Sequence, residues 1–447
     1  MSDIVISGGS ILTLDGENSF HEQGSVEITD GIIESIHSGT HSRGNVLDAN
    51  GKVVIPGLIN GHTHTFIHMF RGLDDDKPLF PWLETLSPAI GLLNEEDMRQ
   101  SNYLGVMEAI LTGTTTLCEC CRYNPIITAE IGSELGLRVF TGGMPASEWF
   151  GEKLDTDLDG LKNKTQYISE HPEEYNGLAY PYLGVHSPYN CSPSFIRRAK
   201  ENANELDVHF NIHLSETQDE IDLIERRYGK SPVEFLEDLG VLDDKLIADH
   251  CVFFDADDIS LFSESGAGII HNPISNAKLW SGVAPIKEYL DAGIPVGLGT
   301  DSVVSNNSFN MFEEMKFGTL LQRAGSHSSS KDPVNAYDFL KMATIGSAKV
   351  LGLDKEIGSL EEGKRADIVV VDLPPEMPLS PHHVISHLVY STEPKHIDVV
   401  IVDGKVVARD GALENTDSEE LRSRLKEYFS SRWKEIREKL PDEIFIT

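Results

Sequence analysis

The chain has 447 residues, 40% of them apolar, and its 72 acidic residues against 37 basic ones give a net charge of −35. This length predicts one large domain with a smaller one. So acidic a chain lacks the basic patches that nucleic acid and anionic membranes require, and no apolar run reaches the roughly 18 residues of a membrane span.

The acidic residues are dispersed along the chain rather than gathered in one tail. Screening by salt removes the self-repulsion of such a surface, so we expect a halophilic protein, the alternative being an ordinary soluble acidic one. The first residues, Met1 to Val5, lack the basic start and apolar stretch of a signal peptide. The five cysteines, an odd number, do not form a disulfide framework. A cytoplasmic protein is therefore expected, and Cys118, Cys120 and Cys121 are assigned to ordinary packing, with Cys120 or Cys121 as candidates to line a pocket.

Residues 1–56 predict short strands joined by tight turns. Asp30-Gly31 lies between alternating apolar residues, which is a strong hairpin signal. The same pattern returns near the C-terminus in 366–372 and 399–407. Because strand-rich ends flank a long middle, we predict a small β-sandwich domain assembled from residues 1–56 and 357–411.

The middle of the chain, residues 57–356, alternates apolar strand candidates with helical stretches. A strand-like segment, Lys52–Pro56, runs through a Gly-rich turn into His62, and seven candidates follow: Thr114–Glu119, Leu137–Met144, Ala179–His186, Val208–Glu216, Leu246–Val252, Gly268–Ile274 and Pro295–Asp301. Helix starts are predicted at Asn94, Ser194, Ser231 and Asp332. Eight such units predict an α/β fold, a (β/α)₈ TIM barrel over 57–356.

Residues 412–447 predict a C-terminal helical extension. A charged helix is expected over 418–440, and its apolar positions are Leu421, Leu425, Tyr428 and Trp433. These side chains would pack the helix against the rest of the molecule.

Polar residues gather at the predicted strand ends. His62 and His64 are two apart, so in an extended strand they point to one face, as two ligands of one metal must. Strand ends farther along carry His186, His213 with Glu216, His250, His271 and Asp301. In a barrel of this type the active site lies at the carboxyl ends of the strands, so these side chains are expected to converge.

Three imidazoles and a carboxylate suit one divalent metal, Zn²⁺ or else Fe²⁺, with a position left for water. A bound metal can lower the pKa of that water to about 7, which generates hydroxide at neutral pH. Attack on an electron-poor carbon also needs a proton shuttle. Glu216, three residues beyond His213, is placed for this general acid/base role.

These motifs resemble the amidohydrolase superfamily, and within it the ATZ/TRZ family of methylthioadenosine/S-adenosylhomocysteine deaminases and triazine hydrolases. The likeness covers nearly the whole chain. It rests on the segments 56–64, 111–116, 213–216, 271–279, 299–302 and 358–367.

The resemblance implies a role for each residue that matches the motifs. His62, His64, His213 and Asp301 would bind the metal, and Asp301 would also orient the water. Glu216 would move protons to the ring nitrogen and leaving group, and His250 would contact the hydroxide or the developing oxyanion. His186, Glu216, Trp82 and His271 would contact the substrate. Two-metal relatives carry a lysine on the fourth strand, which residues 178–187 lack, so one metal is expected.

The expected activity is deamination of an amino-substituted N-heteroaromatic ring of the purine, nucleoside, pterin or triazine type by a metal-bound hydroxide. The adenosine-type deaminases of the family hold the ribose hydroxyls with a glutamate, and Ile90 occupies that place here, which argues against a nucleoside. Loss of chloride or an alkylamine from a triazine-type ring is the first alternative, and an inactive barrel acting as a binding protein is the second. Relatives are often homodimers or larger, so a homo-oligomer is the expectation for this chain.

Overall fold

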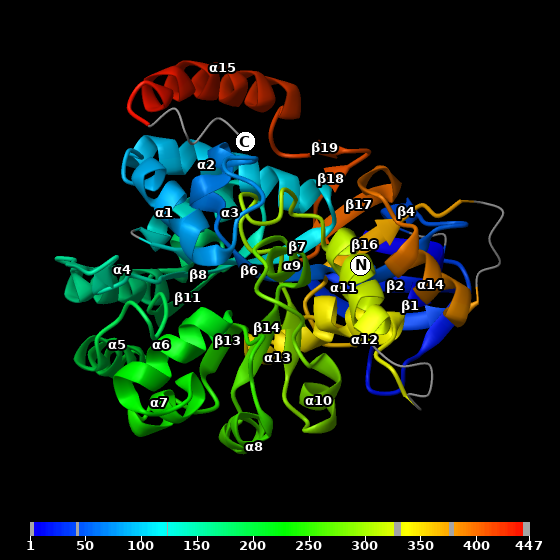
Figure 1. Cartoon of the computed structure of the whole chain (residues 1–447). Helices are drawn as coiled ribbons and strands as arrows, with labels where there is room; N and C mark the ends of the chain where they lie inside the picture. The colour runs from blue at the N-terminus through cyan, green and yellow to red at the C-terminus, as the bar shows by residue number, and fades with distance from the viewer. Residues whose placement is uncertain (1–3, 42–43, 123, 326–331, 375–379, 441–447) are drawn as a thin grey trace.

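The computed structural model describes residues 4–41, 44–122, 124–325, 332–374 and 380–440. In this part of the chain an eight-stranded parallel sheet forms a barrel with helices outside it. A nine-stranded sheet built from both ends of the chain lies beside the barrel (Figure 1). The predicted fold class, a (β/α)₈ barrel with a small β-domain from both chain ends, is confirmed.

The barrel strands run parallel and neighbour one another in chain order. They are β6 (Leu58–Thr63), β7 (Thr114–Cys121), β8 (Arg138–Gly143), β11 (Ala179–Gly184), β12 (Phe210–Leu214), β13 (Leu246–His250), β14 (Gly268–His271) and β15 (Val296–Leu298). A bridge between Thr63 and Asp301 joins the first strand to the chain that leaves the last one. All strands therefore present their carboxyl ends at one rim.

One strand prediction was wrong. The segment 52–56 forms β5 (Val53–Pro56), which belongs to the nine-stranded sheet, and the expected Gly-rich turn is the barrel strand β6. A Cβ on Gly57 would lie 2.0 Å from the Thr115 side chain, and one on Gly61 would lie 2.5 Å from Ile270. These glycines allow close passage between strands, and neither supplies a turn.

The helical layer follows from local capping chemistry. Asn94 and Ser231 cap helices as predicted, whereas Ser192 and Asn335 are the caps where Ser194 and Asp332 were expected. The helices around the barrel are α1 (Leu79–Ile90), α2 (Glu95–Leu111), α3 (Pro125–Leu135), α4 (Leu158–Glu170), α5 (Pro193–Glu205), α6 (Gln218–Tyr228), α7 (Pro232–Asp238), α8 (Ala256–Ser265), α9 (Pro273–Lys278), α10 (Ile286–Asp291), α11 (Met311–Gly325), α12 (Ala336–Lys341) and α13 (Ser347–Val350). A further helix, α14 (Pro381–Tyr390), packs against α11 and α12.

The nine-stranded sheet is continuous and curls around its own apolar core. Its strands are β1 (Ile4–Leu12), β2 (Phe20–Thr29), β3 (Ile32–Ser38), β4 (Val46–Asp48), β5, β16 (Ile368–Val371), β17 (Ile397–Val402), β18 (Lys405–Arg409) and β19 (Ala412–Leu413). Asp30-Gly31 turns between β2 and β3 with positive φ at both residues, as the hairpin signal predicts. A bridge between Ile32 and Arg365 brings distant parts of this sheet together, so the two faces of the sandwich come from one sheet.

The C-terminal helix α15 (Ser418–Arg437) lies over α2 (Figure 1). Leu421 and Leu425 are buried as predicted, and the Tyr428 hydroxyl donates to Asp97 on α2 at 2.7 Å. Arg432 also pairs with Asp97, at 2.8 Å. None of the described helices is long and apolar enough to cross a membrane.

A buried ion pair ties the barrel to the curled sheet. Arg138, the first residue of β8, donates through Nε and Nη2 to the two carboxylate oxygens of Asp367 at 3.1 and 3.0 Å. Asp367 directly precedes β16, and its backbone oxygen accepts the Gly57 N–H at 2.8 Å. Burial lowers the pKa of Arg138, but the Asp367 carboxylate outweighs it and keeps the guanidinium charged. The pair is bidentate and shielded from water.

We predict that Arg138→Met destabilises the protein by about 3–5 kcal/mol, because it leaves the Asp367 carboxylate buried without its partner. The midpoint of urea denaturation, compared with wild type, measures this loss. Arg409→Met is the matched control, since Arg409 pairs with Glu414 at the surface and should change stability by less than about 1 kcal/mol. Equal midpoints for both variants would contradict the prediction.

Candidate active site

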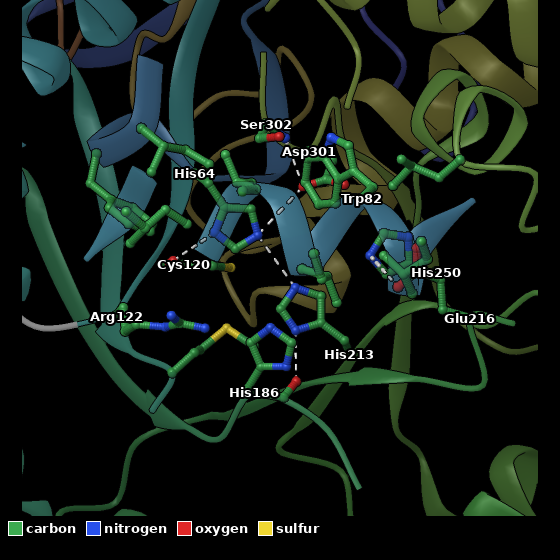
Figure 2. A pocket seen from close by; sticks show the side chains of 18 of the residues that line it. His64, Trp82, Cys120, Arg122, His186, His213, Glu216, His250, Asp301 and Ser302 are labelled. Carbon is green, nitrogen blue, oxygen red and sulfur yellow. Dashed lines mark hydrogen bonds and ion pairs between the residues drawn. The ribbon is translucent and has the colours of Figure 1, made fainter. Parts of the chain in front are cut away.

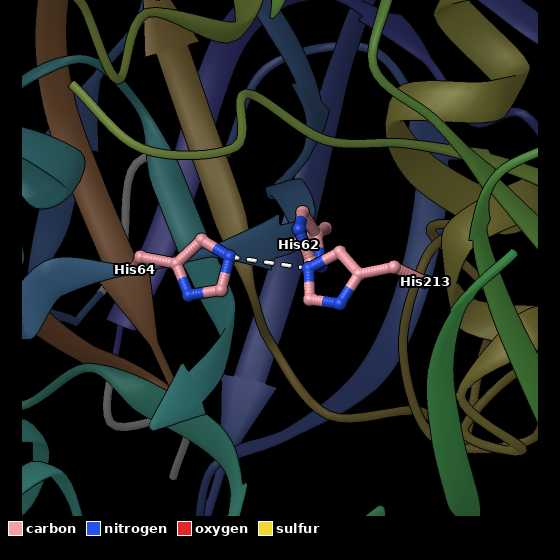
Figure 3. A group of neighbouring side chains, drawn as sticks. All are labelled: His62, His64 and His213. Atoms are coloured by element: carbon pink, nitrogen blue, oxygen red, sulfur yellow. Dashed lines mark hydrogen bonds between the residues drawn. The ribbon is translucent and has the colours of Figure 1, made fainter. Parts of the chain in front are cut away.

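Three imidazoles meet at the carboxyl rim of the barrel. His62 lies in β6, His64 directly follows it, and His213 lies in β12 (Figure 3). The Nε2 atoms of His64 and His213 are 3.3 Å apart. Candidate ligand atoms of all three residues lie within 4.8 Å of one another. The His-x-His spacing thus brings two side chains to the same point as a third one from the opposite part of the ring.

The orientation of these rings suits a cation. Nδ1 of His64 donates to the Cys120 carbonyl at 2.8 Å, and Nδ1 of His213 donates to the His186 carbonyl at 2.6 Å, which leaves a lone pair on each Nε2. Burial lowers the pKa of His64 to about 4 and that of His213 well below 6.5, so both rings are neutral. Two lone pairs facing each other at 3.3 Å repel. Nitrogen ligands about 2.0–2.1 Å from a tetrahedral Zn²⁺ have this separation, so the residues fit a metal.

Asp301 completes the cluster with a carboxylate. Its Oδ1 lies 3.6 Å from His62 Nε2 and 3.4 Å from His64 Nε2. Its Oδ2 accepts the hydroxyls of Ser275 and Ser305 at 2.6 and 2.9 Å. Burial raises the pKa of Asp301, but the contact with His62 outweighs it, and the pKa stays well below 3.8. The carboxylate is therefore ionised and fixed in orientation.

His62 is held from below by two buried groups. Its Nδ1 lies 3.0 Å from Asp249 Oδ2 and 3.1 Å from the Cys120 sulfur. Within the described residues its Nε2 is buried without a hydrogen-bond partner. Burial lowers the pKa of His62, but the Asp249 carboxylate raises it well above 6.5. A carboxylate behind a histidine orients the ring toward a metal and raises its basicity. The Asp249 carboxylate favours a positive charge at His62, and a metal ion bound at Nε2 would supply that charge in place of a proton.

Glu216 and His250 face each other beside this cluster. The Glu216 carboxylate lies 3.9 Å from His250 Nε2 and accepts the Ser281 hydroxyl at 3.2 Å. Nδ1 of His250 donates to the Asn276 side chain at 2.8 Å, which fixes the ring. Burial raises the pKa of Glu216 above its usual value. A buried carboxyl near an open pocket can both take up and release a proton at neutral pH.

A second buried acid positions Glu216. The Glu220 carboxylate accepts the backbone N–H groups of Ser215 and Glu216 at 3.0 and 2.9 Å. Ser215 has a left-handed backbone, with φ of 50°, so this loop needs an outside contact to hold its shape. Burial raises the pKa of Glu220 to about 8. Glu220 therefore holds the backbone of Glu216 in place, and its own side chain does not line the pocket.

A pocket of about 650 Å³, counted with its open mouth, lies over the cluster (Figure 2). The expected substrate contacts His186 and Trp82 line it, together with His64, His213, Glu216, His250 and Asp301. Its other walls are mostly apolar and come largely from α1 and the segments after β7 and β8. Their main members are Phe66, Leu79, Leu83, Leu86, Ile90, Met144, Trp149 and Tyr189. The shape and lining suit a flat aromatic ligand.

His271, an expected substrate contact, needs correction. Its neighbour Ile270 points into the barrel, where it meets Gly61 and Gly297. Side chains alternate along a strand, so His271 points outward, and its ring lies 6.3 Å from that of Phe339 on α12. It does not line the pocket.

Sequence reasoning missed several residues of the site. Asp249 precedes His250 in β13, and strand alternation would have placed it inside the barrel below His62. Arg122 and Trp149 line the pocket from irregular or very short segments and carry no periodic signal. Ser281 and Glu220 act through contacts that only the fold creates. Cys120, one of the two cysteines expected near a pocket, does line it.

Known proteins match this chain over most of its length. Residues 53–407 match the model described as the amidohydrolase family. A 5-methylthioadenosine/S-adenosylhomocysteine deaminase of Carboxydothermus hydrogenoformans is 38% identical over 84% of this chain and 86% of its own. A 5′-deoxyadenosine deaminase of Methanosarcina mazei is 37% identical over 92% of this chain and 94% of its own. The crystal structure of an adenosine deaminase from Xanthomonas campestris with bound zinc covers 98% of this chain and 99% of its own, with TM-score 0.89 and 27% identity.

We predict that Glu220→Gln changes how stability depends on pH. Burial raises the pKa of Glu220 from 4.5 to about 8, so the folded protein keeps this proton while the unfolded chain loses it. The contribution of protonated Glu220 to the free energy of unfolding is therefore fully present below about pH 4.5, and it is lost as the pH rises through about 8. The wild type should lose its advantage in Tm over Glu220→Gln between about pH 5 and pH 9.

Thermal melts of the two proteins across this pH range measure the effect. Glu225→Gln is the matched control, because Glu225 is exposed on the same helix and its variant should follow the wild type. A Tm difference between Glu220→Gln and wild type that stays constant with pH would contradict the assignment.

Proposed function

The chain belongs to the amidohydrolase family, and from this we propose that it is a metal-dependent deaminase of adenine nucleosides. The reaction consumes one water, replaces the exocyclic amino group of the ring by oxygen and releases ammonia. One observation carries the proposal: a buried, protonatable Glu216 stands beside a cluster of three imidazoles and one carboxylate in the same pocket.

We assign His62, His64, His213 and Asp301 as the ligands of one divalent metal. Zinc fits the nitrogen and carboxylate donors, and the relative of known structure from Xanthomonas campestris holds zinc. When bound, the metal would lower the pKa of a water to about 7 and so supply the nucleophile. Asp249 supports the set from behind through His62.

The proton steps belong to Glu216, His250 and Asp301. Glu216 would take one proton from the attacking water and deliver it to the ring nitrogen, and it would then move the second proton, that of the added hydroxyl, to the leaving amino group. Burial raises the pKa of Glu216 above its usual value, which favours the uptake of the proton that it must pass on. The Nδ1–H of His250 is engaged with Asn276, so the neutral ring offers its Nε2 lone pair, which would accept a hydrogen bond from the attacking water. Asp301, ionised and fixed by two serines, would orient the water.

The walls favour a flat ring with an apolar substituent. Trp82, Leu83 and Leu86 on α1 offer packing surface, and the indole N–H of Trp82 is buried without a partner among the described residues. Ile90, which argued against a nucleoside, lines the pocket at the end of α1. Its side chain accepts no hydrogen bond, so packing would hold the sugar here in place of a carboxylate. The named relatives act on adenosine-type substrates, which favours the nucleoside.

Two alternatives are weaker. Removal of chloride from a triazine-type ring would leave the acid function of Glu216 without use, because ammonia leaves better when protonated whereas chloride needs no proton. An inactive binding protein would have no need of a shuttle aligned with a complete ligand set. Both alternatives predict that no ammonia is released.

We also propose, from the composition, that the protein works in a salt-rich cytoplasm without nucleic acid or membrane partners, and, from the family resemblance, that it is a homo-oligomer. The net charge of −35 destabilises a compact chain through self-repulsion at low ionic strength. The acidic residues are spread over many elements, so the repulsion acts on the whole fold.

Ammonia release from 5′-deoxyadenosine, guanine and a chlorotriazine, with chloride measured in parallel, tests the proposed function. The wild type should contain about one metal ion per chain and release ammonia from 5′-deoxyadenosine. Glu216→Gln should lower this rate by about 100-fold or more while metal content stays unchanged, because the shuttle is lost and the ligands remain.

Asp219→Asn is the matched control, since Asp219 is exposed three residues farther along. It should keep the wild-type rate. Wild-type release of chloride without ammonia would support the triazine alternative, and metal-loaded protein that releases neither would support the binding protein.

For the salt proposal, we predict that Tm rises by more than about 5 °C between 0.1 M and 2 M KCl, because the Debye length falls below about 3 Å and screens the acidic surface. Differential scanning fluorimetry measures this. A series in sucrose, which favours compact states without screening charge, is the control. Equal Tm values at both salt concentrations would overturn the proposal.

A further inference from the structure

Arg122 is the one lysine or arginine among the described residues that line the active-site pocket. It directly follows β7, and its guanidinium carbon lies 4.2 Å from the centroid of the Trp149 ring. Figure 2 shows Arg122 and Glu216 on opposite sides of the pocket, with His186 and His213 between them. A cation therefore stands across the pocket from the proposed proton shuttle.

The wall behind Arg122 is rigid. The Trp149 indole N–H donates to the Ser87 hydroxyl on α1 at 2.7 Å. The ring of His186 meets the Trp149 ring edge to face at 5.0 Å. His186 is held in turn by Asn190, whose side-chain amide donates to its Nδ1 at 3.0 Å. The guanidinium is thus placed by stacking on a fixed aromatic surface.

No carboxylate of a described residue forms an ion pair with Arg122. Among the described residues, none places a carboxylate oxygen within 4.0 Å of its guanidinium. This is unusual in a chain with 72 acidic and 37 basic residues, where an arginine has many potential partners. A planar guanidinium whose donors are free of carboxylate in a pocket is suited to a carboxylate or phosphate, which it binds through paired, charge-assisted hydrogen bonds.

There is also room for such a group. Arg122 lines an adjoining hollow of about 660 Å³, counted with its open mouth, between the segment after β8 and the start of α4. Leu154, Lys164 and two acidic residues, Asp155 and Asp157, line the same hollow, so its positive side is the one that Arg122 and Lys164 form. A substituent that leaves the ring away from Glu216 would pass Trp149 and reach the guanidinium at the junction of the two spaces.

We infer that Arg122 is a specificity-determining residue that binds an anionic group at the end of the substrate's substituent, remote from the reacting ring. This inference rests on the proposed function, because the ring must lie between the metal ligands and Glu216 for its substituent to point toward Arg122. The shared chemistry is an anion of carboxylate or phosphate type. The stacked Trp149 face would contact the apolar part of the same substituent.

The experiment compares kcat/KM for four adenine nucleosides that differ at the 5′ end. S-adenosylhomocysteine carries a carboxylate and adenosine 5′-monophosphate a phosphate, while methylthioadenosine and 5′-deoxyadenosine are neutral there. Arg122→Gln should lower the ratio of anionic to neutral kcat/KM by about 10- to 100-fold, mainly through KM, because a charge-assisted hydrogen bond is lost. Arg122→Lys, which keeps the charge, should retain part of the ratio.

Arg198→Gln is the matched control, because Arg198 pairs with Asp159 on the exposed surface and its loss should leave the ratio unchanged. The anionic substrate whose ratio falls identifies the group as carboxylate or phosphate. Equal losses for all four substrates in Arg122→Gln, or an unchanged ratio, would overturn the inference while leaving the proposed function intact. Failure of the wild type to release ammonia from any of the four would instead overturn the proposed function.

Discussion

The site depends on closure of the barrel between its first and last segments. The Asp301 N–H donates to the His62 carbonyl at 2.9 Å, and one residue earlier the Thr300 N–H donates to the Asn60 side chain at 3.0 Å. The Asn60 amide returns a hydrogen bond to the Thr300 hydroxyl at 2.8 Å. These groups are buried, so leaving them unpaired would be costly. The same contacts that close the ring set Asp301 against the histidines of the first strand, and fold and ligand cluster therefore form together.

Strained backbone at the strand ends aims the side chains of the candidate site. Ser215, His250 and Asp301 are not glycine, yet they have φ of 50°, 71° and 61°. Each such residue costs on the order of 1–3 kcal/mol, which surrounding contacts must offset. Glu220 holds the backbone at Ser215, and Asn276 holds the ring of His250. The turned backbone lets consecutive side chains face one pocket where a regular strand would send every second one outward.

Much of the fold and the core of the site could be predicted from sequence, because alternation and the carboxyl-rim rule are local. The failures have physical causes. The side-chain pattern of Lys52–Pro56 predicts a strand correctly, but such a pattern does not indicate which sheet the strand joins. His271 obeys alternation and faces out, whereas the neighbouring strand's His250 escapes it through a positive φ. Arg122 and Trp149 meet only because the ends of two strands are adjacent, and no pattern within either segment records that contact.

The proposed chemistry and the proposed recognition lie on different parts of this chain, and its charge affects them differently. The ligand cluster and Glu216 sit on strand ends that closure holds rigidly, while the apolar wall and Arg122 come mostly from α1 and the segments after β7 and β8. A surface field from a net charge of −35 repels an anionic substrate at low salt, but it is screened beyond about 3 Å at 1 M. A contact inside the pocket is screened far less. In high salt, discrimination between substrates therefore rests on the few side chains that touch them, and the acidic surface contributes solubility without opposing entry.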